Sequence, residues 1–499
     1  MNRFFANRRA LRCFGAPYRS STARRRPPAW MATLLGAALL PAWVHAAETP
    51  PANLATNAAP WMARPLSLED CLNIAFQQNA TVQESRKDLA AAHGVSIQTR
   101  AIVIPKVQAV GAYGIVEPGA VDKLEIPPNP LFPGGVPVVD PGDQNWSTEI
   151  RLVQSIFEGG RMLSSLRTAR LIREQALAQY QAVVADTATD VRVAYYDVLL
   201  GEKEIVVNEA SVELLQRELE DSQRRFNAGT VPRFNVLRAE VELANARPKV
   251  SRARNGYRLA KNRLVNLLGY DVPRDVWEDI PLHLTGTLDA PKFEMGVPEA
   301  LARAIERRPE LVALRKAEEL QREGVVSAKA GYLPRLQGYV GYGARKSNFS
   351  SALDDEVHGW EAGVQATWNI FDGALTRGKV AEARALLEKS EIQSADAARR
   401  IELEVRSAYS TLVESWEVMQ SQAKVVEQGE EALRLARARA DAGTGTQLDV
   451  LSAQTALTEA RTTDVRAKRE YAVALARLER AIGAYVPTTD AAKAKAGSP

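Results

Sequence analysis

The chain has 499 residues and a formal net charge of +4, with 25% charged and 6% aromatic residues. Basic residues do not cluster outside the extreme N-terminus, so the charge pattern excludes the usual nucleic-acid-binding surface, and we expect no nucleic-acid partner. The length alone suggests about three ordinary domains. However, Ala, Leu, Glu, Arg and Gln are abundant, and this composition favours long helices over compact cores.

The N-terminus has the pattern of an export signal. An arginine-rich stretch precedes a short apolar core at 30–43, and residues 44–46 fit a small-x-small cleavage rule. We predict a signal peptide over 1–46, cleaved after Ala46. A membrane anchor is the alternative, although the apolar core is short for a membrane span. Because no apolar run of about 18 residues follows, a later membrane crossing would require a closed barrel.

A leader and a first helix follow the signal. Residues 47–65 are rich in Pro, Ala and Asn and are expected to be flexible. A helical pattern begins after Ser67, which suits an N-cap, and it ends at Pro105. A second pattern of this kind spans about 298–333 and ends at Pro334.

The chain contains the same pattern twice. Arg225–Thr230 recurs as Arg439–Thr444, a shift of 214 residues (439 − 225), and Trp146 recurs as Trp360 at the same shift. The repeated unit is far longer than a solenoid period, so it predicts pseudo-symmetry between two large units. We divide the chain into a first repeat at 66–269, a linker at 270–296, a second repeat at 297–485 and a disordered tail at 486–499.

Each repeat changes from helical to strand periodicity after its proline. We expect two β-hairpins, at about 106–157 and about 335–371, and a loop in the Pro/Gly-rich stretch within the first. Strict apolar and polar alternation at 360–370 indicates a strand with one apolar and one polar face. The polar face carries Glu361, Gln365, Thr367 and Asn369.

Tryptophans mark this hairpin as a candidate membrane segment. Trp360 and Trp368 lie eight residues apart, which is about 26 Å along a strand, or about 20 Å at a tilt near 40°. That separation is close to the distance between the aromatic girdles of a membrane barrel. With Trp146, they are our candidate membrane-interface residues, in contact with outer-membrane lipid. The alternative is a soluble hairpin with one buried face.

A very long helical pattern follows each hairpin. Neither 161–228 nor 375–442 contains a proline, and each spans 68 residues (228 − 161 + 1), about 100 Å as a helix. Gly229 and Gly443 then mark tight turns, with Pro232 suited to the first turn of the next helix. Return helices are expected to about residue 268 and about residue 482.

The number of strands predicts an oligomer. One chain supplies four strands, which is too few to close a transmembrane barrel, since the smallest have about eight. Open strand edges are not tolerated in lipid. Several copies must therefore share one barrel, and three copies would give twelve strands within a near-sixfold ring of helical hairpins.

These features resemble the TolC-type outer-membrane efflux family, the outer membrane factors. The matching motif is Arg439–Thr444 followed by Asp449–Leu451, with its first copy at Phe226–Gly229 followed by Asn235–Leu237. The resemblance covers about 66–485. It implies a mostly α-helical homotrimer with a twelve-stranded membrane β-barrel, whose long antiparallel helical hairpins form a periplasmic tunnel. It also implies an outer-membrane location with a periplasmic extension, and two partners, a periplasmic adaptor and an inner-membrane transporter.

The resemblance also implies an entrance site. In the family, aspartates of the second tip motif surround the narrow periplasmic entrance, and Asp449 matches the first of those positions. Three such carboxylates near an axis would repel one another and favour cations. Ser452 occupies the second position, which weakens the ring. The alternative is that Asp449 is a solvated carboxylate at a helix start, stabilised by the helix dipole.

Other members of the family lock the entrance through links between a Tyr, an Arg and an acidic residue. The matching positions are Ala440, Gly445 and Asn235, and all three lack the required charge or hydroxyl. We therefore expect this chain not to use that lock. Asn235 remains a candidate for the pore constriction, together with Asp449 and Ser452.

The two tips are the expected docking sites of the adaptor. The alternative is that their residues only satisfy turn geometry. The docking candidates are Gly229, Thr230, Val231, Gly443, Thr444 and Gly445.

Signals for catalysis are poor. His93, His283 and His358 lie far apart, and no metal-ligand spacing or nucleophile motif is present. We expect no enzyme activity, no metal and no cofactor. The leading hypothesis is a passive outer-membrane duct of a tripartite efflux or type I secretion system. The alternative is a non-conducting helical scaffold of the envelope, which would not need a polar strand face.

Overall fold

The structure is a computed structural model of the chain. It describes residues 64–121, 124–126, 130, 133, 136–139, 141–271 and 279–484. The predicted signal peptide, most of the leader and the predicted tail lie outside these residues, as does part of the linker, 272–278. The described chain is mostly helical, as predicted, with one four-stranded and one two-stranded sheet. No helix within the described ranges combines the length and the apolar character needed to cross a membrane.

The first predicted helix is divided into α2 (Leu68–Gln78) and α3 (Ala80–Arg100). Ser67 caps α2 as predicted, in a capping box with Asp70. The prediction of one helix to Pro105 is wrong because Asn79 leaves helical geometry, at φ −59° and ψ 129°. Its side-chain oxygen caps α3 at the Val82 N–H (3.2 Å), while its amide nitrogen donates to Leu267 O (2.8 Å).

The corresponding helix of the second repeat is divided as well, into α6 (Val297–Arg307) and α7 (Pro309–Lys329). The single helix predicted over about 298–333 is therefore also wrong. Arg308 is extended, at φ −64° and ψ 122°, because the residue before a proline is forced out of the helical region. A short 3-10 turn, η3 (Ala330–Tyr332), leads from α7 to the sheet.

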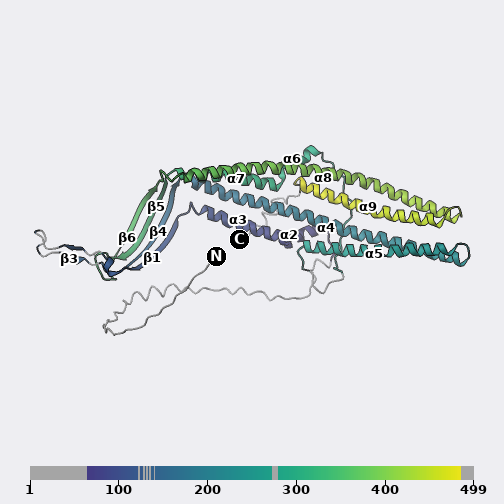
Figure 1. Cartoon of the computed structure of the whole chain (residues 1–499), viewed down its shortest axis with the longest axis horizontal. Helices are drawn as coiled ribbons and strands as arrows, with labels where there is room; N and C mark the ends of the chain where they lie inside the picture. Colours follow the sequence, from purple (N-terminus) through teal and green to yellow (C-terminus); the bar gives the residue numbers. More distant parts are fainter. Residues whose placement is uncertain are drawn as a thin grey trace, which may run out of the picture. The chain divides into compact units, whose positions relative to one another are not determined.

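The larger sheet is antiparallel, in the order β1-β4-β5-β6. Its strands are β1 (Lys106–Ile115), β4 (Gln144–Glu158), β5 (Arg335–Lys346) and β6 (Glu356–Thr367). Each repeat thus supplies two strands, and the central pair β4–β5 joins the repeats (Figure 1). The strand predicted to continue through residues 368–370 ends earlier, at Thr367, because its last partner is Arg335 at the start of β5.

The loop predicted within the first hairpin contains regular structure. It holds a 3-10 turn, η2 (Pro118–Ala120), and a short antiparallel pair, β2 (Leu124–Ile126) with β3 (Val136–Val139). The loop prediction is wrong on this point because strands of three and four residues among Pro and Gly are too short to show a periodicity.

The two long helices are confirmed. α4 (Arg161–Asn227) and α8 (Leu375–Asp441) have 67 residues each, or about 100 Å at 1.5 Å per residue. Each begins directly after a residue of positive φ, Gly160 at 92° and Ala374 at 69°. The chain therefore turns from sheet to helix through a left-handed residue in both repeats.

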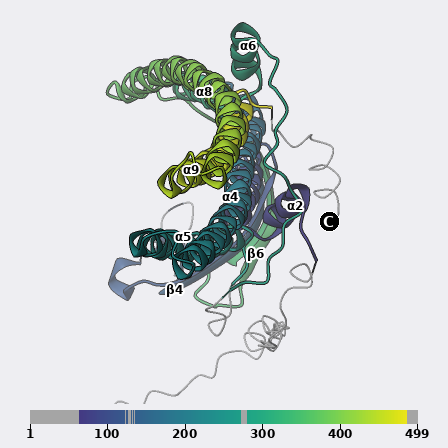
Figure 2. The same ribbon diagram turned by 90° about the vertical axis from the view of Figure 1, so that its right-hand side faces the viewer.

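The return helices, α5 (Arg233–Leu267) and α9 (Gln447–Ala481), have 35 residues each. The prediction that Pro232 lies in the first turn of α5 is wrong, because Pro232 is the N-cap, the residue just before that helix. α5 contacts α4, α9 contacts α8, and α9 also contacts α4. The four helices therefore lie in the order α8, α9, α4, α5, which Figure 2 shows from the side of the helix tips.

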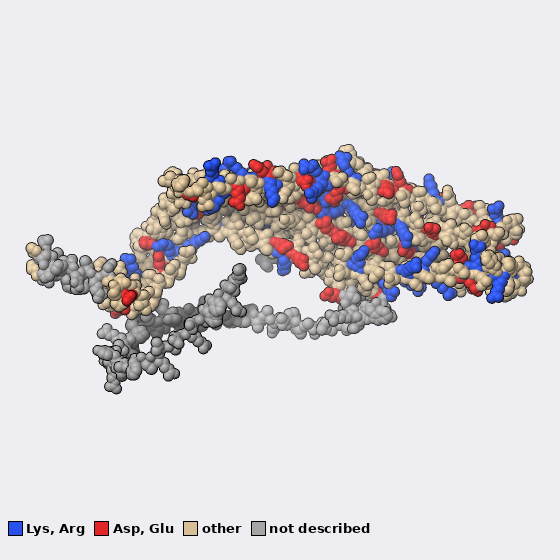
Figure 3. Space-filling model, viewed as in Figure 1, with Lys and Arg blue, Asp and Glu red and all other residues tan. Residues whose placement is uncertain are grey.

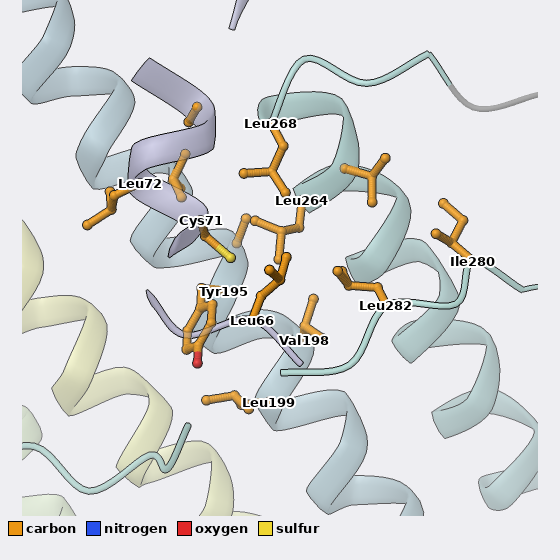
Figure 4. Packing of buried hydrophobic residues seen from close by; sticks show 14 of the residues in the cluster. Leu66, Cys71, Leu72, Tyr195, Val198, Leu199, Leu264, Leu268, Ile280 and Leu282 are labelled. Atoms are coloured by element: carbon orange, nitrogen blue, oxygen red, sulfur yellow. The ribbon is translucent and has the colours of Figure 1, made fainter. Parts of the chain in front are cut away.

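Two buried clusters hold the helices together. The first joins α2, α4 and α5 to the linker, whose Ile280 and Leu282 are buried beside Leu264 and Leu66 (Figure 4). Leu66 also forms a parallel β-bridge with Leu284. The described part of the linker is thus irregular but packed against the helices. The second cluster joins α6, α7, α8 and α9, and its largest members are Leu311, Ile401, Leu412, Tyr471, Leu478 and Ile482.

The close approach of α5 to α4 depends on Gly201. A Cβ atom at this position would lie 2.9 Å from Tyr257 Cα, whereas the neighbouring Gly256 faces open space. We expect Gly201→Ala to destabilise the protein by about 1 kcal/mol or more, because overpacking costs about 1–3 kcal/mol and the helical gain of alanine is up to about 1 kcal/mol.

Thermal unfolding of the purified protein in detergent measures this effect. Gly256→Ala is the control, and it should be neutral or slightly stabilising because alanine favours the helix without meeting a neighbour. Equal melting temperatures for the two variants would contradict the role of Gly201.

Candidate functional site

The two tips, residues 228–232 and 442–446, have the same backbone geometry. Gly229 has φ +71°, its N–H donates to Phe226 O, and the Thr230 N–H donates to Arg225 O. The second tip repeats both bonds 214 residues later, with Gly443 again at φ +71°. This pair of bonds is the Schellman motif, which satisfies the last carbonyls of a helix. Turn geometry therefore accounts for both glycines.

The six docking candidates differ in exposure. Gly229, Thr230, Gly443 and Thr444 are exposed, and Val231 and Gly445 are half-buried. A Cβ atom on Gly445 would lie 2.9 Å from Arg439 Cβ and 3.1 Å from the Ala440 nitrogen, so the turn itself requires glycine at this position. The exposed threonines are the tip side chains that a partner can contact. Docking at these residues stays a prediction.

Asp449 lies in the first turn of α9 and forms a capping box with Thr446. Its Oδ2 accepts from the Thr446 backbone N–H (2.9 Å) and hydroxyl (2.8 Å), and the Thr446 Oγ1 accepts from the Asp449 N–H (3.3 Å). The backbone bond, followed by the hydroxyl bond, lowers the pKa of Asp449 below its usual value, because both favour the ionised carboxylate. Asp449 is therefore an exposed, ionised group at a helix start.

The three candidates for the constriction lie on two helices, α9 and α5. Ser452 is exposed one turn beyond Asp449, whereas Asn235 is half-buried in the first turn of α5. In the order of the helices, α4 lies between α5 and most of α9 (Figure 2), while Leu451 of α9 shares a buried cluster with Leu243 and Ala246 of α5. A constriction shared by these residues stays a prediction.

Contacts that the sequence analysis did not predict join the two tips. Arg225 of α4 donates to Asp441 of α8, with 3.3 Å between Nη2 and Oδ1. The side-chain nitrogen of Gln447 donates to Ser222 Oγ and to Glu218 Oε1 (3.2 Å). Both contacts connect the first repeat to the second. They lie at the tips, where the residues expected to form a family-type lock are missing.

The bonds of Gln447 belong to a longer contact between 186–222 of α4 and 447–480 of α9, which we call the α4/α9 seam. Its further polar contacts, from the tips inward, are Thr458–Ser211 (3.1 Å), Arg466–Glu204 (2.7 Å), Arg469–Asp197 (2.8 Å), Arg192–Glu479 and Arg480–Asp186 (2.7 Å). Figure 3 shows charges of both signs interspersed over the helices on one face of the molecule.

The seam has a sequence signal that the analysis missed. Asp197, Glu204, Ser211, Glu218 and Arg225 recur every seven residues along α4. This spacing keeps side chains on one face of a helix that packs along another. All five make polar contacts with α9 or α8, so the heptad of polar residues predicts the seam.

The four-stranded sheet has two distinct faces, which follow from its register. Residues paired across the strands on one face are apolar: Val107, Ala109, Ile150, Leu152, Val340, Tyr342, Trp360 and Ala362. The opposite face carries Gln108, Glu149, Arg151, Gln337, Glu361 and Gln365. Trp360 is 77% exposed, so the apolar face is not covered within this chain.

The three candidate tryptophans occupy different environments. Trp360 lies within β6, and it is paired across the sheet with Tyr342. Trp368 is exposed, but it lies beyond the end of β6, and its indole N–H donates to Tyr332 O (3.1 Å). The prediction that both tryptophans lie on one strand is therefore wrong, as is the placement of Asn369 on the strand face, while their separation stays a prediction. Trp146 is half-buried and donates to Leu353 O (2.9 Å).

An ion-pair network occupies the polar face of the sheet. Arg151 binds Glu149 (2.6 Å) and Glu361 (2.5 Å), and its guanidinium lies 5.0 Å from the centre of the Tyr339 ring. Glycines in β5 and β6 make room for these groups, because a Cβ atom on Gly341 would lie 2.8 Å from the Glu149 carboxylate. The polar face thus carries charged side chains, and its glycine positions leave space beside them.

Within the described ranges, no group of three or more His, Cys, Asp or Glu side chains is placed to hold a metal ion. The candidate functional features described above are the tips, the α4/α9 seam and the two-faced sheet.

Comparisons with known proteins agree with this arrangement. The family model described as "Outer membrane efflux protein" matches residues 71–270 and 300–484. The chain is 26% identical to the alkaline protease secretion protein AprF of Pseudomonas aeruginosa, over 57% of this chain and 59% of that protein. It is 25% identical to the outer membrane protein TolC of Escherichia coli, over 68% of this chain and 69% of that protein.

Solved structures share the fold. The Campylobacter jejuni CmeC outer membrane channel superposes with a TM-score of 0.70 at 14% identity, over 86% of this chain and 89% of that one. The outer membrane protein VceC of Vibrio cholerae gives a TM-score of 0.66 at 18% identity, over 83% of this chain and 96% of that one.

Proposed function

The chain belongs to the outer membrane efflux protein family, and we propose that it is the outer-membrane duct of a tripartite efflux or type I secretion system. In this role it passively exports substrates that an inner-membrane transporter and a periplasmic adaptor deliver. Like its family, it is an outer-membrane protein with a periplasmic extension. The observation that carries the proposal is the two-faced sheet joined directly to two 67-residue helices.

The two faces of the sheet suit a barrel wall with lipid outside and water inside. An apolar face that is uncovered within the chain would contact lipid, and the polar face with Arg151 and Glu361 would line a water-filled lumen. β1 and β6 each have one unpaired edge in the described sheet, and lipid does not tolerate such edges. Three copies, with twelve strands, would pair them all, as the family resemblance implies.

The same observations favour the duct over the helical scaffold. A non-conducting scaffold needs neither an ion-pair network on one sheet face nor glycines that leave space above it. The apolar face, with the exposed Trp360 on its edge strand β6 and Trp368 just beyond the end of that strand, supports contact with lipid at the membrane interfaces.

At the other end, the tips would form the periplasmic entrance. Three copies of Asp449 near an axis, each held ionised by its capping box, would make the aperture negative and favour cations. Ser452 and Asn235 would complete the constriction. The exposed threonines of the tips would contact the adaptor.

We expect the particle purified in detergent to have the mass of a trimer, because four strands from one chain leave two open edges. Light scattering or native mass spectrometry measures this mass after correction for bound detergent. A stable monomer would contradict the shared barrel and favour the scaffold.

Channel recordings in a planar lipid bilayer test conduction and the aperture. We expect discrete conductance steps with a preference for cations, and a several-fold lower preference in Asp449→Asn because the ring loses its charge. Asp441→Asn, a tip aspartate outside the proposed constriction, is the control. An unchanged ion preference in Asp449→Asn would remove this residue from the aperture.

Adaptor docking is tested at Thr444, which is exposed and, unlike Gly443, does not have the positive φ that favours glycine. Thr444→Trp should abolish export in cells while the yield of assembled protein stays the same, since a bulky side chain at the tip blocks a close contact. Thr444→Ser, which keeps the hydroxyl bonded to Arg439 O, should export normally. Full export by the tryptophan variant would show that this tip residue does not dock the adaptor.

A further inference from the structure

The α4/α9 seam contains a buried amide without partners. Gln454 of α9 is 1% exposed, and within the described chain neither its side-chain oxygen nor its nitrogen has a hydrogen-bond partner. It lies on the same helix face as Leu451, which packs against Leu215 of α4, and Thr458, which bonds Ser211 of α4. Gln454 is therefore enclosed by the seam itself.

A buried amide of this kind disfavours the packed state. In the seam it has lost its hydrogen bonds to water and gained none in exchange. When α9 separates from α4, water reaches the amide and its hydrogen bonds return. Gln454 thus makes separation of the seam less unfavourable than an apolar residue of similar volume would.

Gln447, two helical turns nearer the tip, has the opposite effect. Its amide nitrogen is bonded to Ser222 and Glu218, and Ser222 is buried with 2% exposure. These bonds exist only when the seam is closed. The nearby pair Arg225–Asp441 is largely exposed, and exposed ion pairs contribute little, so Gln447 is the main polar link at the tips.

We infer that Gln447 and Gln454 form a release device for the second helical hairpin, α8–α9, in which Gln447 holds the seam closed and Gln454 limits how tightly it closes. Separation is confined to the segment of α9 at 447–458, because the half-buried pair Arg469–Asp197 secures the seam further inward. The inference rests on the proposed function, since separation at the tips matters to a duct whose entrance opens.

Bilayer recordings of three variants test the device. Gln454→Leu replaces the unpaired amide with an apolar group of similar volume, and we expect the open probability to fall about tenfold, equivalent to about 1.4 kcal/mol. Gln447→Ala removes the link at the tip, and it should raise the open probability. Gln428→Leu makes the same chemical change at an exposed position of α8, and it should have no effect.

Thiol labelling gives a readout that does not depend on conduction. Leu451 of α9 is buried in one cluster with Leu215 of α4, so a thiol introduced by Leu451→Cys becomes accessible to a maleimide when the seam separates. The native Cys71 stays silent because it is fully buried and burial raises its pKa to about 12. Gln454→Leu should slow the labelling about tenfold, and Gln447→Ala should accelerate it.

The two readouts separate the two proposals. Labelling that is unchanged or faster in Gln454→Leu would overturn the release device, whether or not the protein conducts. The expected changes in labelling, in a protein that never conducts, would support the device and contradict the duct.

Discussion

Lateral packing along α4 is the interaction on which the rest of the structure depends. A helix of 67 residues cannot be enclosed by one globular core, so it must bury a stripe along its length against neighbours. α4 contacts α2, α3, α5, α7 and α9, more elements than the other long helix does. It carries the sheet at one end and a tip at the other, and it connects the two repeats through α9. The first tip, the α4/α9 seam and the first two strands of the larger sheet are therefore all connected through this one helix.

The duplication repeats the backbone more faithfully than the side chains. Gly229 and Gly443 have the same φ, and both long helices have the same length, because turn and helix geometry tolerate little variation. The polar contacts of the seam are not repeated. Glu204 and Ser211 of α4 correspond, at the shift of 214, to Val418 and Val425 of α8. The two repeats thus share a fold but present different surfaces.

Local rules predict much of this structure from the sequence. The absence of proline predicts the long helices, glycine predicts the tips, and alternation predicts the strands. Breaks are harder to predict, because the helical pattern continues on both sides of Asn79 and of Arg308. The sequence of β6 does not show where that strand ends either. Alternation continues to Ile370, but the strand ends where its partner begins, at Arg335. The seam depends on which face of α4 meets α9, and only the heptad of polar residues indicates that face.

α4 is one unbroken helix whose inner end is held by contacts with α9. A small rotation at that end therefore produces a large displacement at the tip. The polar contacts at Asp186 and Asp197 fix its position relative to α9, and Ser222 lies 36 residues (222 − 186) beyond the first of them. That length is about 50 Å of helix, so a rotation of about 5° at the inner contacts displaces the tip by about 4 Å. A displacement of that size exceeds the length of a hydrogen bond. The same rotation moves Asp197, which lies 11 residues (197 − 186) from Asp186, by about 1.4 Å. A packing change of about one ångström between the inner contacts is therefore enough to make or break contacts at the tips.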